Sequence, residues 1–254
     1  ESMLVGNSKI KSIISPTTGL DHIDLVAAKR NKVKVYHLRG QKRFLKEVSG
    51  TAELTMAIML SLLRKIPQSF DAVKRGMWEP GPFRGNEVSK KKLGVVGCGR
   101  LGAKVSRVAI ALGMDVFAYD PYIYRFPAGV TQVDSLTELL STIDILTLHI
   151  PLLSETTHLI STKEIEKMKD EVVIINTSRG SIVSTQALLD GLKKGKIKSA
   201  AIDVMEDEHS IKESGHALID YANKYDNLLI TPHIGGATYE SVEKTDLFIL
   251  KKYF

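Results

Sequence analysis

Ionisable side chains that suit acid–base and anion-binding chemistry stand directly after short apolar runs of the sequence. In a parallel sheet the carboxyl ends of the strands meet at one edge, so side chains that follow neighbouring strands converge there. We therefore expect one site that contains an arginine, a carboxylate and histidine. The runs and the residues that follow them are 143–148 with His149, 172–176 with Arg179, 199–203 with Glu206, Asp207 and Glu208, and 228–231 with His233.

These groups together favour hydride transfer that is coupled to proton transfer. A histidine can take the proton of a hydroxyl group because its unperturbed pKa is about 6.5, and a carboxylate bonded to it favours the imidazolium. An arginine matches a carboxylate bidentately and can polarise a carbonyl oxygen. Arg179, Glu208 and His233 fit these roles. Glu206 and Asp207 compete with Glu208, and spacing alone does not choose among the three.

The stretch from Leu93 to Gly102 predicts a dinucleotide-binding turn. An apolar strand leads through Gly97-x-Gly99-x-x-Gly102 into a helix, and Asp120 stands at the end of the next apolar run. Gly97 permits a tight turn, Gly99 lets the backbone approach a pyrophosphate, and Gly102 allows close packing of helix on strand. Asp120 can accept hydrogen bonds from a ribose diol and would repel a 2′-phosphate, which favours NAD over NADP. The competing interpretation is a glycine turn in some other α/β protein.

Repeated alternation of strand and helix between residues 92 and 232 predicts the elements that position these groups. The short apolar runs lack polar alternation, as is typical of strands that are buried on both faces of a parallel sheet. The expected strands are 93–97, 115–119, 143–148, 172–176, 199–203 and 228–231, and the expected helices lie near 100–112, 135–141, 161–168, 184–194 and 214–224. The sequence thus indicates an α/β protein with a Rossmann-type, doubly wound parallel sheet.

The flanking segments are shorter and less regular. Residues 1–50 hold two small βα-like pieces, with strands at 10–14 and 33–37 and a helix at 21–30, too little to bury a core alone. An apolar helix is expected over residues 51–66, ended or kinked by Pro67 and continued helically to Arg75. A turn-rich linker follows at 76–82, and a last helix is expected from Tyr239 to Phe254.

Composition indicates a globular protein without specialised surfaces. The net charge is +6, but the basic residues are scattered, which favours ordinary surface lysines over a nucleic-acid interface. No apolar run approaches 18 residues, and we expect a cytoplasmic protein without membrane contact.

Cys98, the single cysteine, is expected to pack inside the glycine turn, with a redox role as the alternative. No metal-ligand spacing and no Gly-x-Ser-x-Gly turn are present. The remaining histidines, interpreted as surface or packing residues without convergent partners, are His22, His37, His158, His209 and His216.

Nine stretches in order along the chain resemble the D-isomer-specific 2-hydroxyacid dehydrogenase family, which includes phosphoglycerate and glycerate dehydrogenases and glyoxylate/hydroxypyruvate reductases. The stretches are Thr18 to Asp24, Thr51 to Glu53, Gly76 to Trp78, Leu93 to Gly102, Tyr119 to Pro121, His149 to Pro151, Asn176 to Gly180, Ala201 to Val204 and Thr231 to Gly236. The resemblance implies an NAD-dependent enzyme that acts on the CH–OH group of a D-2-hydroxy acid, or on the matching 2-keto acid, and a homodimer.

The resemblance also assigns roles residue by residue. It places the catalytic glutamate five residues after the strand-end Asp203, at Glu208, with Arg179 and His233 as its partners. It implies that Arg179 and His233 also touch the substrate, as does the loop at Thr18 and Gly19. The cofactor contacts it implies are Gly97, Gly99, Arg100, Leu101, Gly102, Asp120, His149, Pro151, Thr156, Thr177, Ser178, Asp203, Gly235 and Gly236.

The resemblance further predicts how the chain divides. Residues 1–50 would be the remainder of a flavodoxin-like substrate domain, 51–236 the NAD-binding domain with its inter-domain helix, and 237–254 a helix that returns toward the substrate domain. Much of the substrate domain is expected to be missing. His209 stands where the family has a proline after the glutamate, and the segment from there to His233 looks longer than usual. Glu208 argues against a formate dehydrogenase, which pairs the histidine with glutamine. The alternative function is an NAD(H)-sensing, corepressor-like binding protein on the same scaffold.

Overall fold

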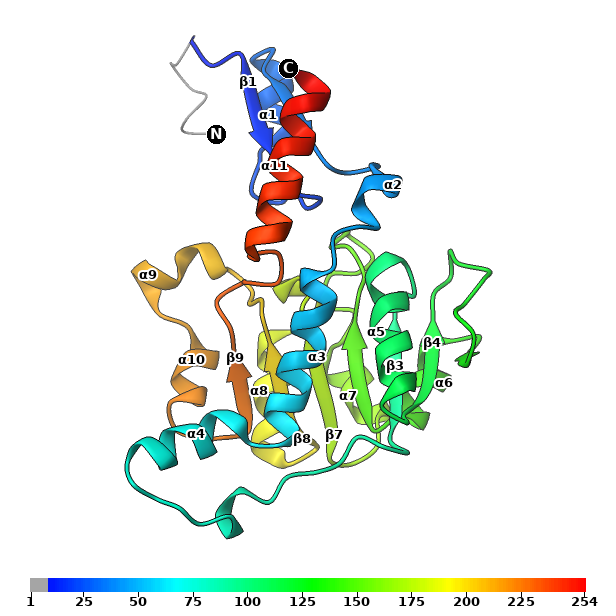
Figure 1. Ribbon diagram of the computed structural model, residues 1–254, viewed down its shortest axis with the longest axis vertical. Coiled ribbons are helices and arrows are strands. Elements are labelled where there is room, and N and C mark those ends of the chain that lie inside the picture. The colour runs from blue at the N-terminus through cyan, green and yellow to red at the C-terminus, as the bar shows by residue number, and fades with distance from the viewer. Residues whose placement is uncertain (1–8) are drawn as a thin grey trace. The chain divides into compact units, whose positions relative to one another are not determined.

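The computed structural model describes residues 9–254, apart from the side chains of residues 212 and 213. It forms two compact units (Figure 1). The larger unit comprises Thr51–Gly235, and the smaller combines the described residues up to Gly50 with Gly236–Phe254. Each unit has its own sheet and its own clusters of buried apolar side chains.

The larger unit is built on a seven-stranded sheet in which every pair of neighbouring strands is parallel. The spatial order is β5-β4-β3-β6-β7-β8-β9, so the chain starts in the middle, runs to one edge and then crosses to fill the other side. This reversal is the doubly wound, Rossmann-type arrangement that the sequence predicts. The strands are β3 Lys92–Val96, β4 Asp115–Tyr119, β5 Val130–Gln132, β6 Ile145–Leu148, β7 Val172–Asn176, β8 Ile197–Ile202 and β9 Leu228–Ile230.

Helices bury both faces of this sheet (Figure 1). Strand β7 shows the consequence, because Val172 and Ile174 pack into one core whereas Val173 and Ile175 pack into the core on the other face. The strands lack alternating polar residues, and the burial on both faces that this pattern predicts is confirmed. On one side lie α3 Gly50–Leu63 and α5 Arg100–Ala111, and on the other α6 Leu136–Thr142, α7 Thr162–Lys167, α8 Thr185–Lys194 and α10 Ala217–Ala222.

Three local features differ from the sequence prediction. Strand β5 was not expected, because its three residues are largely exposed and lack an apolar run. The helix expected near 214–224 is the shorter α10, and an additional helix, α9 Ile211–Ser214, precedes it and is separated from it by Gly215 with a φ of +68°. The long apolar helix ends at Leu63, and Pro67 stands in the first turn of the next helix, α4 Ile66–Lys74, where a missing N–H costs nothing.

Helix α3 is the most apolar helix, and only its residues 53 and 57 are exposed. Within residues 9–254, no helix combines the length and the apolarity that crossing a bilayer requires. The α3 side chains instead pack in the core that they share with β3, β6 and β7.

The smaller unit contains a two-stranded parallel sheet, β1 Ser12–Ser15 with β2 Lys34–His37. Helix α1 Leu25–Arg30 connects the strands, and Asp24 caps it by accepting a hydrogen bond from the Ala27 amide. The short helix α2 Lys42–Leu45 and the last helix, α11 Tyr239–Tyr253, complete the unit. Phe44 and Phe248 stack with ring centroids 3.9 Å apart, so the C-terminal helix supplies apolar surface that the first 50 residues lack.

Candidate active site

The glycine turn after β3 has the geometry that a pyrophosphate needs. Gly97 has a φ of +87°, and a Cβ on Gly102 would collide with the Gly97 carbonyl oxygen, so both positions require glycine. Gly99 caps α5, no side chain bonds to the first turn there, and a Cβ on Gly99 would meet nothing within 4 Å. Backbone amides at a helix N-terminus suit phosphate oxygens, and the absence of a side chain at Gly99 leaves room for such a group to approach. The residues present therefore fit a dinucleotide.

Two further side chains complete the surroundings of this turn. Asp120 Oδ2 accepts a hydrogen bond of 2.9 Å from the Cys98 amide, which ties the end of β4 to the turn. Each carboxylate oxygen can accept more than one bond, so Asp120 keeps capacity for a ribose hydroxyl. Cys98 is buried, and burial raises the pKa of its thiol, so the predicted packing role is confirmed.

His149 follows β6, the strand that pairs with β3, so it stands at the same carboxyl edge of the sheet as the glycine turn. Its Nε2 lies 3.0 Å from Thr147 Oγ1, and its Nδ1 is buried without a hydrogen-bond partner. Burial lowers the pKa of His149 to about 4, so the ring is neutral near pH 7 and suits a pocket wall rather than an acid. Thr156 donates to the Pro151 carbonyl oxygen at 2.7 Å and accepts from the Leu153 amide, so it also shapes the loop after β6.

His233 and Glu208 form the central pair of the site. His233 Nδ1 lies 2.6 Å from Glu208 Oε1, which leaves Nε2 as the nitrogen available to a substrate. Of the three carboxylates that spacing left open, Glu208 is the one that contacts His233, whereas Glu206 bonds elsewhere and Asp207 is exposed. The side chain of His233 is 46% exposed, so a small molecule can reach it.

Asp203 holds the turn that carries His233. The carboxylate is buried at the end of β8 and accepts hydrogen bonds from the Thr231 hydroxyl at 2.6 Å, the Ile234 amide at 2.8 Å and the Gly235 amide at 2.7 Å. His233 itself has a φ of +53°, a conformation that costs a residue with a side chain free energy. The bonds on both sides of His233 maintain that conformation and fix the direction of the imidazole.

Arg179 stands on a second braced turn, after β7. Asn176 Nδ2 donates to the Arg179 carbonyl oxygen at 2.9 Å, and Asn176 Oδ1 accepts from the Ser178 amide at 3.0 Å. Ser178 Oγ donates to the Leu148 carbonyl oxygen, and Thr177 Oγ1 lies 2.8 Å from Thr55 Oγ1 of α3. The sequence analysis assigned no role to Asn176 or Thr55, although the polar residue at the end of the apolar run of β7 was a usable signal for Asn176.

The Arg179 turn and the Glu208 loop are in direct contact. A Cβ on Gly180 would collide with the peptide between Met205 and Glu206, so only glycine lets the two segments approach this closely. Glu208 thus contacts His233, and the turn after β7 packs on the loop before Glu208, whereas the guanidinium Nη1 of Arg179 donates to the Ser178 carbonyl oxygen at 2.7 Å. A joint role for these three residues stays a prediction. Thr18, Gly19 and Gly236 belong to the smaller unit, and their binding roles stay predictions.

His158 and His216 contradict the expectation that they lack convergent partners, because both bond to Glu206. His158 Nε2 lies 2.5 Å from Glu206 Oε1, and His216 Nε2 lies 3.1 Å from the Glu206 carbonyl oxygen. His22 also has a partner, since its Nε2 lies 3.2 Å from Ser15 Oγ. The expectation was wrong because the partners of His158 and His216 lie 48 and 10 residues away in the chain, where no local pattern shows them.

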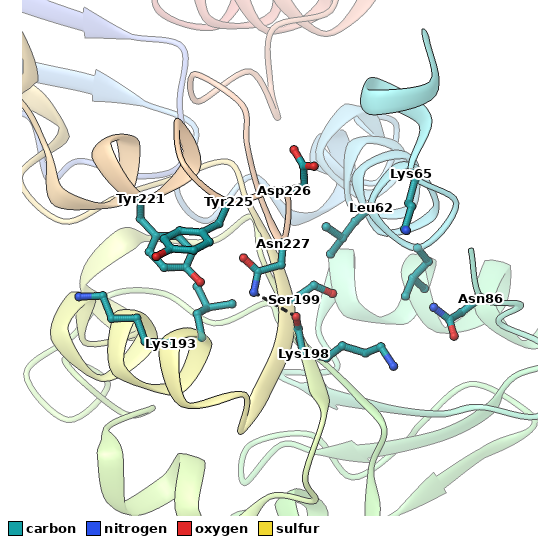
Figure 2. Close-up of a pocket in the computed structure, with 12 residues that line it drawn as sticks. Leu62, Lys65, Asn86, Lys193, Lys198, Ser199, Tyr221, Tyr225, Asp226 and Asn227 are labelled. Carbon is teal, nitrogen blue, oxygen red and sulfur yellow. Dashed lines mark hydrogen bonds between the residues drawn. The ribbon is translucent and has the colours of Figure 1, made fainter. Parts of the chain in front are cut away.

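A cavity of about 520 Å³ lies at the opposite, amino-terminal ends of β8 and β9 (Figure 2). Tyr221, Tyr225, Lys193 and Asn227 are among its lining residues, and none of the site residues discussed above lines it. Among the described residues, no group of histidine, cysteine, aspartate or glutamate side chains could hold a metal ion.

Comparisons with known proteins agree with this geometry. Residues 56–235 match the family model of the D-isomer specific 2-hydroxyacid dehydrogenase, NAD binding domain. The chain is 39% identical over 236 residues to a D-3-phosphoglycerate dehydrogenase of Methanocaldococcus jannaschii, covering 92% of this chain and 43% of the relative. It is 34% identical to a hydroxypyruvate reductase of Thermotoga maritima, covering 99% of this chain and 79% of that protein.

Solved structures show the same similarity. A D-lactate dehydrogenase of Aquifex aeolicus, in complex with NAD and lactic acid, superposes with a TM-score of 0.80 at 33% identity, and the match covers 95% of this chain and 74% of that one. The chain thus spans less than half the length of the Methanocaldococcus relative and about three quarters of the lactate dehydrogenase.

Proposed function

The chain belongs to the D-isomer-specific 2-hydroxyacid dehydrogenase family, and on this premise we propose that it interconverts a D-2-hydroxy acid and a 2-keto acid with NAD(H). The observation that carries the proposal is the 2.6 Å contact between His233 and Glu208 in the unit that also holds the glycine turn. Residues 56–235 match the NAD-binding domain of the family. The reaction also requires bound NAD, and we assign its binding to the glycine turn of this domain.

In the proposed mechanism His233 is the acid–base group. NAD, when bound, supplies the chemistry of accepting or returning a hydride at the carbinol carbon. His233 Nε2 takes the hydroxyl proton in the oxidative direction and returns it in the reductive direction. Glu208 holds Nδ1 at 2.6 Å, which fixes the ring orientation and stabilises the imidazolium that forms.

Arg179 is the proposed anchor for the substrate carboxylate and the C2 oxygen. Its guanidinium is planar and permanently charged, and it can bind two oxygens at once. The turn that carries Arg179 is braced by Asn176 and packs on the loop that carries Glu208, which supports a joint role for these residues. We assign a second carboxylate contact to the loop at Thr18 and Gly19 on the family resemblance.

For the cofactor, we assign contacts to the glycine turn with Arg100 and Leu101, to Asp120 and to the pocket wall at His149 and Pro151. The position of the glycine turn at the N-terminus of α5 supports the pyrophosphate contacts. Further cofactor contacts are assigned by the resemblance to Thr156, Thr177, Ser178, Asp203, Gly235 and Gly236.

The substrate is proposed to be 3-phosphoglycerate with its keto acid, or hydroxypyruvate or glyoxylate. The two relatives named above support this range, since one is a phosphoglycerate dehydrogenase and the other a hydroxypyruvate reductase. A panel of 2-keto acids with NADH and NADPH, followed by the loss of reduced cofactor, tests the proposal. We expect turnover of at least one acid with NADH in preference to NADPH. Binding of NADH without turnover of any acid would contradict it.

The protein is also proposed to be a homodimer. Large apolar side chains are exposed on α4 and on the segment after it, among them Phe70, Val73, Met77 and Trp78. Exposed apolar patches of this kind mark association surfaces, and twofold symmetry is the commonest arrangement of identical chains. A cytoplasmic location is proposed as well, since the free, buried thiol of Cys98 suits a reducing compartment.

A further inference from the structure

We propose that Glu206 and His158 act as a clamp that positions Glu208, and through it His233. Glu206 is one of the carboxylates that competed for the catalytic role, and it stands two residues before Glu208. The inference rests on the proposed function, because it assigns positioning residues to that same reaction. Neither Glu206 nor His158 touches the reacting atoms in this assignment.

Both carboxylate oxygens of Glu206 are engaged. Oε2 accepts a hydrogen bond of 2.8 Å from the Thr185 amide, in the first turn of α8, and Oε1 lies 2.5 Å from His158 Nε2. A carboxylate only accepts, so His158 Nε2 carries the proton of this bond. Burial alone would raise the pKa of Glu206, but the hydrogen bonds from Thr185 and His158 outweigh it and hold the pKa below its usual value. Glu206 is therefore ionised, as a helix N-terminus favours.

The main chain at Glu206 is held from two more sides. His216 Nδ1 accepts from the Leu218 amide, which leaves Nε2 to donate to the Glu206 carbonyl oxygen at 3.1 Å. Gly180 packs against the peptide bond that precedes Glu206. Glu206 thus joins the loop after β8 to the Arg179 turn, to the start of α8 and to the loop that carries His158.

Glu208, in contrast, has little support of its own. Apart from the His233 contact, its carboxylate accepts one long bond of 3.4 Å from the Met205 amide. Asp207, between the two glutamates, is exposed and has a φ of +50°, so the chain turns sharply there. The position of Glu208 consequently depends on where Glu206 fixes the preceding peptide. A misplacement of about 1 Å in a catalytic group can cost about 100-fold in rate.

The test starts from four single variants of the full chain. Glu206→Ala removes the clamp, and Glu206→Gln keeps an oxygen that accepts from the Thr185 amide. His158→Asn removes the histidine bond while retaining a residue that tolerates the φ of +52° found there. Asp207→Asn is the matched control, because it removes a neighbouring carboxylate that is exposed and outside the clamp.

We expect Glu206→Ala to lower kcat about 10-fold or more, Glu206→Gln to restore much of that loss, and the Kd for NADH to stay within about twofold in both. His158→Asn should lower kcat in the same direction, and Asp207→Asn should not. In a Glu208→Gln background the Glu206→Ala change should cause no further loss, because the clamp acts through Glu208. Full additivity of the two changes, or an unchanged kcat in Glu206→Ala and His158→Asn, would overturn the proposal.

An NMR measurement tests this inference independently of the proposed reaction. The Nδ1 proton of His233 in its short hydrogen bond should give a downfield NMR signal, identified by its loss in His233→Gln. We expect the signal to shift or vanish in Glu206→Ala and to persist in Asp207→Asn. An unchanged signal in Glu206→Ala overturns the clamp even if no 2-keto acid is reduced, whereas absence of turnover in the unaltered protein overturns only the reaction.

Discussion

The most direct prediction about catalysis concerns the side chain of His233. His233→Ala removes the acid–base group and should lower kcat by roughly 10²–10⁴. The Kd for NADH should hardly change, because the glycine turn does not depend on the imidazole. Steady-state kinetics and a fluorescence titration with NADH measure the two quantities. His209→Ala, which removes an exposed histidine next to Glu208, is the control and should keep its activity. Near-unchanged turnover in His233→Ala would contradict the assignment.

His149 makes a prediction about stability and pH. Its pKa is about 4 in the folded protein, where burial disfavours the charged ring, against about 6.5 in an unfolded chain. The unfolded state therefore binds a proton that the folded state refuses, and stability is lost as the pH falls from about 6.5 toward about 4. Between about pH 7 and pH 5 the loss should reach about 2 kcal/mol.

Unfolding measured across that pH range in the unaltered protein and in His149→Asn isolates this effect. The variant lacks the titrating ring, so its stability should fall less steeply toward acid pH. Equal pH dependence in the two proteins would show that the imidazole titrates freely in the folded state.

The residue scale also shows where sequence reasoning reaches its limit. Polar groups after apolar runs predicted the edge at which Arg179, Glu208 and His233 stand, because parallel strands end together. The choice among Glu206, Asp207 and Glu208 came from the family resemblance and then from a distance of 2.6 Å. The His158 contact with Glu206 could not be predicted, because it depends on how two loops fold back over 48 residues.

At the scale of elements, the βα turn at Gly97 to Gly102 allows a paired test. Gly102→Ala places a methyl group against the Gly97 carbonyl oxygen, so the backbone must shift and the melting temperature should fall by several degrees. Gly99→Ala meets no atom and has an ordinary negative φ, so the fold should be unaffected. The added methyl group would still stand where the pyrophosphate approaches.

Calorimetry and NADH titration separate these two glycines. We expect Gly99→Ala to keep its melting temperature and to bind NADH at least about tenfold more weakly, a loss of about 1.4 kcal/mol. Gly102→Ala should lose both stability and binding. Tight NADH binding by Gly99→Ala would mean that the pyrophosphate does not approach this turn.

Whether a strand or helix was predictable from the sequence depends on its burial and on its local backbone conformation. Strands β3 and β7 were found because uniform apolar runs are required where helices cover both faces. Strand β5 was missed because it is a short, exposed strand at the sheet edge, where pairing with β4 rather than burial defines it. The break between α9 and α10 depends on the conformation of Gly215, which a helical periodicity does not reveal.

At the scale of the whole molecule, the two units differ in the structural features that they contain. The larger unit holds the complete sheet, the glycine turn and the three proposed catalytic residues. The smaller unit buries two small apolar clusters and depends on residues from both ends of the chain, among them Leu38 and Ile249. The second of these clusters was not predictable from local patterns, because the pairing of distant segments creates it.

The proposed association of two chains through α4 and the segment after it makes a prediction at the scale of the whole molecule. Phe70 and Trp78 are 62% and 86% exposed, and removing such side chains should not disturb the core. We expect the unaltered protein to sediment as a dimer and the double variant Phe70→Ser/Trp78→Ser to sediment as a monomer with an unchanged melting temperature, because lost interface area weakens association without opening a cavity. Tyr124→Ser removes an equally exposed aromatic ring elsewhere in the larger unit and should remain dimeric. A double variant that stays dimeric would place the interface on another surface, and a monomeric unaltered protein would contradict the homodimer itself.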